Sequence, residues 1–423
     1  MKVLNRIYPL SKVSLELIHR FCSLIDNNNK LYIDNINYLQ KMKFTCKTIN
    51  LKEGISKVER IVSKQTTLPI LGNILISSEK GRLVLAATNL EIAIKVYIGA
   101  KIEKEGSITI PARIIGGFLN TIKDEVVSGE LEGAELKITT ENHKIKIKGI
   151  DAKDFPIIPD VPDEPFFSIQ SKKINKAISG VLVSVAHNDT RQELNGVLMK
   201  FKNKGITLAS TDSFRLTEID IKGIKVIDET NFETFKEKKN SIIIPALALM
   251  EVQRIARDEE INVIIEQNQL FISTSETKIV SRLINGNYPE YKQVLPKKFD
   301  IELEVEKEKL TNAVKIASLV TNSQNGEVNF KNTKELDALL ITAQSMDSGD
   351  NLSKIPTKIK GSEFEILFNC RFILEGLASV LFDSEKVLIK LNKQKSPVMF
   401  KKIKAKGEID ESFSYIIMPI VKS

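Results

Sequence analysis

Three aspartates are the residues in this chain that come nearest to a catalytic arrangement. Asp189, Asp212 and Asp220 carry the type of oxygen ligand that Mg²⁺ requires, and a hard cation is held by several such oxygens converging on one point. They fall on different predicted turns, however, and Asp212 is better placed to cap its own turn with its side chain. A metal-dependent nucleic-acid enzyme is therefore only an alternative interpretation.

Signatures of other catalytic machinery are missing from the sequence. It holds no GxxxxGK[ST] loop, no GxGxxG turn and no HExxH helix, so nucleotide chemistry and zinc-protease chemistry have no starting point. A lone histidine such as His143, beside a predicted strand, is more often a hydrogen-bonded surface group than a catalyst. We therefore expect no catalytic residues, no metal site and no cofactor.

Length and composition set the broad class. A chain of 423 residues is expected to form two to four domains, at roughly 100–200 residues each. The apolar fraction is 42% and the charged fraction 27%, and no stretch approaches the ~20 apolar residues that a membrane span needs. The net charge of +8 is a small excess among 62 basic and 54 acidic residues, which permits contact with nucleic acid.

Cysteine usage points to the compartment. Cys22, Cys46 and Cys370 are odd in number and far apart, so they indicate neither a disulfide framework nor a metal-binding pair. A soluble protein of the reducing cytoplasm, without a membrane partner, is the expectation.

The first 41 residues differ from the rest of the chain. They are rich in Asn and Lys around residues 27–30 and lack the rhythm of strands and turns that begins at Met42. We interpret 1–41 as an N-terminal extension that is either disordered or a mis-started addition, with a genuine tail as the alternative.

A repeated unit organises the remainder. The segment SITIPA at 107–112 recurs as SIIIPA at 241–246, and Phe155-Pro156 recurs as Tyr288-Pro289. A weaker third copy of the first segment lies at 364–369. Self-similarity at a fixed period indicates tandem repeats, and domains of about 127 residues are of the usual size. The predicted domains are 42–163, 164–296 and 297–423.

Within each repeat the pattern predicts an α+β fold of antiparallel strands and two helices. Residues 144–148, KIKIK, alternate with the period of a half-exposed strand. Apolar residues at helical spacing predict six amphipathic helices, each covering one face of a sheet. These helices are expected near 51–62, 115–122, 174–185, 249–255, 310–317 and 372–381.

Basic residues lie on or beside the polar faces of all six predicted helices. Any one of them could be an ordinary solvated face, and acidic neighbours such as Glu53 and Glu251 dilute the charge. Because basic residues recur on or beside every predicted helix, contact with nucleic acid is the preferred interpretation. The basic residues are Lys52, Lys57, Arg60, Lys64, Arg113, Lys123, Lys172, Lys173, Lys176, Arg254, Arg257, Lys307, Lys309, Lys315 and Arg371.

Several short motifs carry a family resemblance. From Met42 to the C-terminus, about nine-tenths of the chain, they follow the order and spacing of the bacterial DNA polymerase III beta subunits, the beta sliding clamps, which this sequence resembles. The motifs are MKFT at 42–45, TLPILGN at 67–73, DFP at 154–156, AH at 186–187, LNG at 194–196, TDSFRL at 211–216, YP at 288–289, VLP at 294–296 and MP at 418–419.

The resemblance implies three similar clamp domains per chain and a head-to-tail homodimer that closes into a ring around double-stranded DNA. Helices would line the hole and attract phosphates without reading bases, which allows sliding. The implied partners are the DNA polymerase III alpha subunit, the clamp loader and repair polymerases. A structural repeat protein that is not a clamp is a second alternative.

The resemblance also assigns residues to DNA contact. The family's DNA-touching loop after the first helix corresponds to Lys64 and Gln65, and its Ala-His pair leads to His187 and Asn188. Gln65 stands where the family often has a basic residue, so Lys64 is the expected substitute. Three basic residues of the predicted helices, Lys172, Lys176 and Arg254, complete the predicted DNA-binding set.

Partner proteins of this family insert a short peptide, apolar at its end, into a cleft between the second and third domains. A concave apolar surface with a few polar anchors suits such capture, although core packing is the alternative for each apolar residue alone. Departures from the family pattern are Ser213, Phe214, Gln293 and Ile420. The matching positions are Leu194, Thr211, Ser213, Phe214, Arg215, Leu216, Pro289, Gln293, Val294, Ile416, Ile417, Met418, Pro419 and Ile420.

For the seam of the ring, the family analogy places Ile145 and Ile147 on one edge, against Leu319 and Val320 of the partner chain on the other. Exposed apolar edge strands tend to pair. For Ile147, an inward-facing position within one domain remains an equal alternative.

Overall fold

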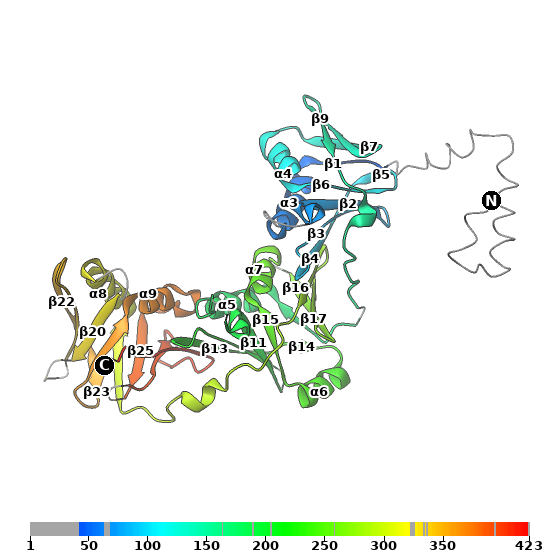
Figure 1. Ribbon diagram of the computed structural model, residues 1–423. Helices are drawn as coiled ribbons and strands as arrows, with labels where there is room; N and C mark the ends of the chain where they lie inside the picture. Colours follow the sequence, from blue (N-terminus) through cyan, green and yellow to red (C-terminus); the bar gives the residue numbers. More distant parts are fainter. Residues whose placement is uncertain are drawn as a thin grey trace, which may run out of the picture. The chain divides into compact units, whose positions relative to one another are not determined.

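A computed structural model describes most of the chain in two compact units (Figure 1). The described residues are 42–62, 68–162, 164–187, 190–203, 205–257, 259–321, 326–332, 335, 337–392 and 395–421. Of the described residues, the first unit contains those from Met42 to Ala86 together with 97–155, and the second contains 87–96 and those from Pro156 onward. The predicted N-terminal extension, 1–41, lies outside the described residues.

The first unit is built from two strands that each run directly into a helix. β1 (Lys43–Lys47) leads into α3 (Thr48–Val58), and β6 (Ser107–Pro111) leads into α4 (Ala112–Thr121). A five-stranded antiparallel sheet has the order β5-β1-β7-β8-β9, and β2 pairs with both β3 and β6. The remaining strands are β2 (Asn73–Glu79), β3 (Arg82–Thr88), β5 (Lys101–Lys104), β7 (Val126–Glu132), β8 (Glu135–Thr139) and β9 (Lys144–Lys148).

Both helices of the first unit bury the face that the sequence pattern predicts. Leu51, Ile55 and Val58 of α3 are buried, as are Ile115 and Leu119 of α4. Apolar side chains at this spacing form one stripe along a helix, and the stripe packs into the core. Short 3₁₀ turns accompany these elements at η1 (Glu59–Ile61), η2 (Pro69–Gly72) and η3 (Ala152–Asp154).

The second unit repeats the strand-into-helix arrangement four times. These pairs are β10 (Phe167–Gln170) with α5 (Ser171–Leu182), β15 (Ser241–Pro245) with α7 (Ala246–Ile255), β19 (Ile301–Glu306) with α8 (Lys307–Val320), and β24 (Glu365–Asn369) with α9 (Cys370–Ala378). β6 and β15, the two copies of the repeated hexapeptide, have the same sequence of buried and part-buried positions. The predicted α+β fold with tandem repeats is confirmed.

One sheet joins the second and third repeats. Its order is β15-β11-β12-β13-β27-β26-β25-β19-β23, and the junction is the antiparallel pair β13–β27. The chain therefore satisfies these strand edges internally, as sheet edges require. The strands not yet given are β11 (Gly196–Lys202), β12 (Gly205–Thr211), β13 (Arg215–Lys222), β23 (Lys358–Lys360), β25 (Lys386–Leu391), β26 (Val398–Ile403) and β27 (Phe413–Ile417).

Two further groups of strands complete the second unit. In the second repeat the order is β14-β10-β16-β17-β18, and β18 also pairs with residues Ile92 to Val96 of β4 (Ile92–Ile98). In the third repeat a four-stranded sheet has the order β22-β21-β20-β24. The remaining bounds are β14 (Lys225–Val226), β16 (Glu260–Glu266), β17 (Gln269–Ser273), β18 (Thr277–Arg282), β20 (Glu327–Asn332), β21 (Ala338–Ser345) and β22 (Gly349–Pro356).

One helix was not predicted. α6 (Glu229–Lys238) lies between β14 and β15, and the Asp228 side chain caps it by accepting a hydrogen bond from the Asn231 amide at 2.9 Å. Its anchor is Phe232, which is buried against Phe167 and Phe201. The sequence of α6 is mostly polar, with few apolar residues, so a search for apolar periodicity does not find it. The prediction of six helices was incomplete.

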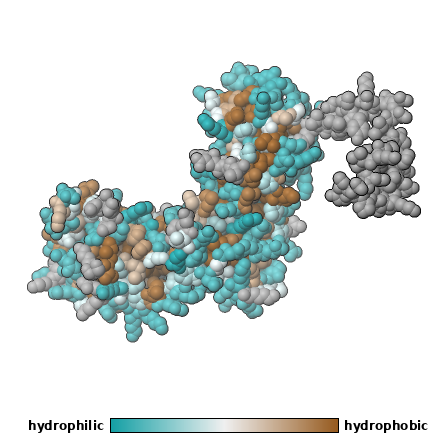
Figure 2. Space-filling model, viewed as in Figure 1, coloured by the Kyte–Doolittle hydropathy of each residue, from teal (hydrophilic) through white to brown (hydrophobic). Residues whose placement is uncertain are grey.

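None of the helices in the described ranges combines the length and the apolar character needed to cross a membrane. On the face shown in Figure 2, hydrophilic residues cover most of the described surface, and hydrophobic residues form smaller patches.

Candidate functional site

A tight turn between β12 and β13 forms the centre of the predicted cleft. The Asp212 carboxylate accepts hydrogen bonds from the amides of Phe214 at 3.0 Å and Arg215 at 2.9 Å. Thr211 Oγ1 donates to the Arg215 carbonyl at 2.7 Å. Ser213 has a φ of +78°, a left-handed conformation that glycine adopts most easily. The predicted capping role of Asp212 is confirmed by its two hydrogen bonds from the turn.

The last strand of the chain fixes this turn from the third repeat. β27 pairs with β13 so that Ile416 lies opposite Leu216, and the Met418 amide then donates to the Phe214 carbonyl at 2.8 Å. Further along, the Ile420 amide donates to the Leu367 carbonyl of β24 at 2.8 Å. The C-terminal residues are therefore held on both sides by backbone hydrogen bonds.

The predicted cleft residues divide by exposure. Leu216 and Ile416 belong to a core cluster with Leu198, Ile243 and Tyr291, so for them the core-packing alternative describes the structure. The other buried members are Leu194, Thr211, Arg215 and Ile417. Pro289, Pro419 and Ile420 are partly exposed, and Ser213, Phe214, Gln293, Val294 and Met418 are exposed. The residues of this last group are the ones a partner could touch directly.

The exposed group contains unusually accessible apolar side chains. Phe214 is 62% exposed, Val294 64% and Met418 36%. Large apolar side chains that gather at a surface often mark a place where another molecule binds.

Phe372 of α9 contacts two of the predicted cleft residues, and the sequence did not reveal these contacts. Its ring lies near-parallel to that of Phe214, with an interplanar angle of 26° and centroids 6.5 Å apart. The Arg215 guanidinium lies 4.6 Å from the same ring centroid. In the sequence, Phe372 is one apolar position of a predicted helix, and nothing local to it signals the contact with the second repeat.

The segment between the second and third repeats is anchored by two tyrosines. Tyr288 Oη accepts a hydrogen bond from the Thr211 amide at 2.9 Å, and Tyr291 Oη donates to the Glu218 carboxylate. Burial is the main reason that the pKa of each hydroxyl lies above its ordinary value, because an apolar setting disfavours the charged form. Both hydroxyls therefore remain neutral and hold η5 (Tyr291–Val294), with Gln293 and Val294, against the sheet.

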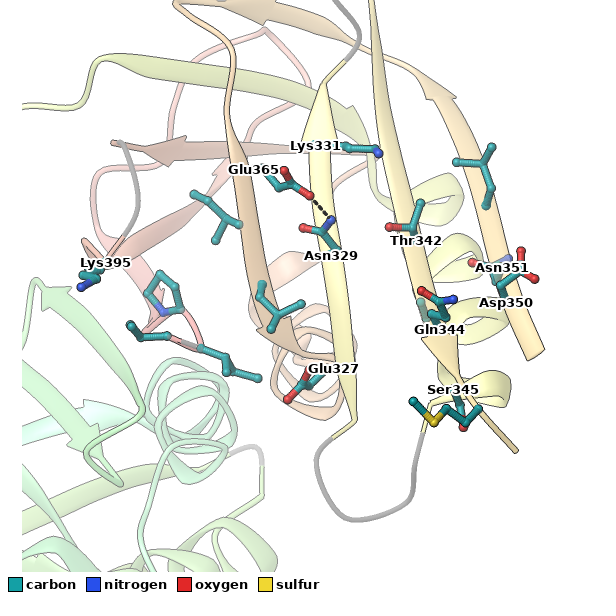
Figure 3. Close-up of a pocket in the computed structure, with 18 residues that line it drawn as sticks. Glu327, Asn329, Lys331, Thr342, Gln344, Ser345, Asp350, Asn351, Glu365 and Lys395 are labelled. Atoms are coloured by element: carbon teal, nitrogen blue, oxygen red, sulfur yellow. Dashed lines mark hydrogen bonds between the residues drawn. The ribbon is translucent and has the colours of Figure 1, made fainter. Parts of the chain in front are cut away.

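A separate groove of about 1090 Å³ lies over the four-stranded sheet of the third repeat (Figure 3). Asn329 and Lys331 of β20 and Thr342 and Gln344 of β21 line it, and Asn329 Nδ2 donates to Glu365 at 2.6 Å. Pro419 and Ile420 of the predicted cleft form part of its wall.

The aspartates considered for metal binding have other partners. Asp212 pairs with Arg215 at 2.9 Å, and Asp220 pairs with Lys202 at 2.7 Å while it accepts from Thr207. Asp189 lies outside the described residues. No group of three or more His, Cys, Asp or Glu side chains suited to a metal ion occurs in the described part of the chain.

The predicted DNA-contacting residues differ in their surroundings. Lys176 forms an ion pair with Asp383 at 2.6 Å, and Arg254 pairs with Glu251 at 2.5 Å. Lys172 of α5 and His187 are exposed. Ion pairs lower the positive charge that a helix offers to phosphates. Lys64, Gln65 and Asn188 lie outside the described residues.

The residues expected at the ring seam also differ in their exposure. Ile147 of β9 lies opposite Leu136 and is only 1% exposed, so the inward-facing alternative describes this residue. Ile145 is partly exposed, as is Val320 at the end of α8, whereas Leu319 is 79% exposed. Among the described strands, β9 and β22 each end a sheet. They leave a row of backbone groups available for pairing.

Comparison with known proteins identifies the family. Models of the N-terminal, central and C-terminal domains of the DNA polymerase III beta subunit match residues 42–159, 168–290 and 292–421. The Beta sliding clamp of Synechococcus elongatus is 26% identical over 386 residues, which are 90% of this chain and 99% of the relative. That of Staphylococcus aureus is 25% identical over 392 residues, again 90% and 99%.

Solved structures agree on the fold. The DNA polymerase sliding clamp of Bacillus subtilis superposes with a TM-score of 0.82 at 23% identity, over 90% of this chain and all of that one. The beta subunit of DNA polymerase III from Thermotoga maritima gives 0.81 at 22% identity, with the same coverage. Three consecutive family domains with this fold leave one assignment: the chain belongs to the DNA polymerase III beta subunit family, the sliding clamps that serve as non-catalytic processivity factors.

Proposed function

We propose that this chain forms one half of a DNA sliding clamp: two copies close head to tail around double-stranded DNA and tether the replicative polymerase to it. The observation that carries the proposal is the run of three beta-subunit domains along one chain. Each brings two strand-into-helix pairs, and β9 and β22 are among the strands that end a sheet in the described part of the chain.

Ring closure is proposed at those open edges. β9 of one copy would pair with β22 of the other, so that backbone hydrogen bonds continue from sheet to sheet as they do within the chain at β13–β27. Leu319 and Leu352, 79% and 65% exposed, would then be covered together with Ile145 and Val320. Heterologous contacts of this kind close into a ring when the rotation between copies permits it.

Enclosure removes the need for strong adhesion to DNA. The net charge of +8 is modest, and ion pairs such as Lys176–Asp383 and Arg254–Glu251 neutralise part of the basic charge on the helices. Residues such as Lys172, His187 and Lys64 would contribute weak, salt-dependent contacts to phosphates, without sequence preference. A clamp held by topology and only weakly attracted to DNA slides freely.

Partner capture is proposed at the exposed cleft residues Phe214, Val294, Gln293 and Met418. A peptide with apolar residues would cover Phe214 and Val294, while Pro289, Pro419 and Ile420 flank it. The DNA polymerase III alpha subunit, the clamp loader and repair polymerases are the proposed partners, used in turn at this one site.

A cytoplasmic location is part of the proposal. Cys46 and Cys370 are both free and buried, and burial raises the pKa of the Cys46 thiol to about 12. A thiol in that state is protonated at neutral pH and resists oxidation.

Retention on closed DNA tests the ring. Clamp loaded onto a nicked circular plasmid is expected to stay bound at salt concentrations that screen phosphate contacts, and to be lost when one restriction cut makes the plasmid linear. Gel filtration of the labelled protein with the DNA measures both. Equal loss from circular and linear DNA would contradict enclosure, and Mg²⁺-dependent cleavage of the plasmid would favour a nuclease instead.

A further inference from the structure

The groove over the four-stranded sheet of the third repeat borders the proposed cleft. Pro419 and Ile420, which belong to the predicted cleft, form part of the groove wall together with Val421, which is 50% exposed. The volume of about 1090 Å³ exceeds that of most small-ligand pockets, which hold about 300–1,000 Å³, so the groove has room for a longer occupant. A polypeptide that leaves the cleft past Pro419 therefore enters the groove.

One side of the groove is an open strand edge. β24 ends the four-stranded sheet, and the only strand pairing along its outer edge, within the described residues, is the isolated bridge between Leu367 and Ile420. There the Ile420 amide donates to the Leu367 carbonyl at 2.8 Å. Backbone groups alternate in direction along a strand, so the amide and carbonyl of Glu365, two residues before Leu367, point to the same edge. An edge of this kind can pair with the backbone of an added, extended chain.

Side chains that form hydrogen bonds cover the floor of the groove (Figure 3). Asn329 of β20 lies opposite Thr342 of β21, and Gln344 follows on the same face two residues further along β21. Asn351 of β22 also lines the groove, and its side-chain oxygen is buried without a hydrogen-bond partner in the described part of the chain. Because buried polar atoms are normally satisfied, this acceptor indicates a place for a donor from a bound chain.

The charges that line the groove nearly balance. Glu327, Asp350 and Glu365 are acidic, whereas Lys331 and Lys395 are basic, so the groove favours neither a strongly acidic nor a strongly basic ligand. None of the described lining residues is aromatic, and single-stranded nucleic acid is usually held by stacking of its bases on aromatic side chains. The groove therefore fits a polypeptide with uncharged polar side chains.

We propose that this groove is a second binding surface for partner proteins, and that it holds the stretch of the partner that adjoins the cleft-bound residues. The stretch is extended, uncharged and polar, and it pairs with the open edge of β24 beside Glu365. The proposal rests on the proposed function of the cleft, although it concerns a separate surface. Because the cleft tethers the partner, binding in the groove is intramolecular and raises the affinity without any change in the apolar contacts.

The experiment uses the full chain and three labelled peptides, with fluorescence polarisation as the measurement. One is a heptapeptide with apolar terminal residues, and the other two carry in addition about eight Ser, Thr, Asn and Gln residues at the N-terminus or at the C-terminus, roughly 26 Å of extended chain. An extended peptide is expected to bind the unmodified clamp about tenfold more tightly than the heptapeptide. N-methylation of alternate amides in that extension should remove the gain, because it removes the donors for strand pairing.

Two variants place the gain in the groove. Thr342→Arg puts a long charged side chain on the groove floor and should abolish the tenfold gain while the heptapeptide binds as before. Gln344→Lys at an exposed position serves as a second variant if Thr342→Arg melts early by circular dichroism. Thr230→Arg is the control, because Thr230 is an exposed residue of α6 in the second repeat, and it should retain the gain.

The outcomes separate the groove from the cleft. If the unmodified clamp binds none of the three peptides, the proposed cleft itself is wrong. If it binds the heptapeptide and both extended peptides equally, only the role of the groove is overturned. A gain that persists in both Thr342→Arg and Gln344→Lys would also overturn it, because the extension would then bind elsewhere.

Discussion

Edge strands are paired at one place in this molecule and unpaired at another. The paired place is the junction between the second and third repeats, and the unpaired ones are β9 and β22. At the junction, β13 and β27 pair within the chain, and Leu216 and Ile416 share one core cluster. At β9 and β22 the sheets of the described structure simply end, and Leu319 and Leu352 near β22 are exposed. Strand pairing and core packing within the chain thus satisfy the backbone groups at the junction, whereas a second copy would have to satisfy those of β9 and β22.

Ion pairs also lie at the junction between the second and third repeats. Lys176 of α5 in the second repeat pairs with Asp383 of the third at 2.6 Å, and Asp383 also pairs with Lys402. Burial alone would raise the pKa of the Asp383 carboxyl. The hydrogen bonds and positive charges of Lys176 and Lys402 together outweigh burial, so this pKa lies below its ordinary value. A partly exposed ion pair therefore crosses the closed junction in addition to the strand pairing.

The largest effect is expected from a charge placed at the open edge. Leu319→Asp should convert the proposed dimer into a monomer of 47.5 kDa, because dimerisation would bury a carboxylate without a partner. Size-exclusion chromatography with light scattering measures the mass. Leu247→Asp on α7, where Leu247 is 42% exposed, is the control and should remain a dimer. A dimeric Leu319→Asp would remove Leu319 from the seam.

A smaller effect is expected from overpacking the closed junction. A Cβ added at Gly180 of α5 would lie 1.8 Å from Leu381 Cδ1 of the third repeat, so Gly180→Ala should lower the free energy of unfolding by about 1–3 kcal/mol. Urea denaturation followed by circular dichroism measures it. Gly117 of α4 has open space around it, and Gly117→Ala should instead stabilise by about 0.4–1 kcal/mol. An unchanged free energy of unfolding in Gly180→Ala would mean that Leu381 can move aside without a cost in stability.

The smallest effect concerns the charges beside β9. Hydrogen bonds from Lys137 and Lys146 lower the pKa of Glu132 to about 2, from an ordinary value of 4.5. Because the folded pKa is depressed, this contribution to stability is complete above pH 4.5 and is lost as the pH falls towards 2. Carboxyl NMR shifts against pH measure it. Lys146→Ala should raise the pKa of Glu132, and an unchanged titration would show that Lys146 is not its partner in solution.

Sequence patterns predicted the repeats and six of the helices because both depend on local order. The hexapeptide at 107–112 and 241–246 becomes β6 and β15, each followed by a helix. α6 was not predicted because its polar sequence shows little apolar periodicity. The helix is held in place by the contacts of Phe232 with Phe167 and Phe201, which belong to other elements of the fold. Ile147 shows the same limit, since alternation places it on one face of β9 but does not say which face is covered.

The sequence by itself therefore determined the modules, their order and the residues of the turn at 211–216, because propensity, periodicity and side-chain capping act over a few neighbouring residues. Only the tertiary structure decided which of those residues are accessible. Phe214 is exposed while Leu216, two positions away, is core, and Arg215 is committed to Glu375, 160 residues further along the chain. Burial and ion pairing across such separations depend on how sheets and helices pack, and that packing is not contained in any local pattern.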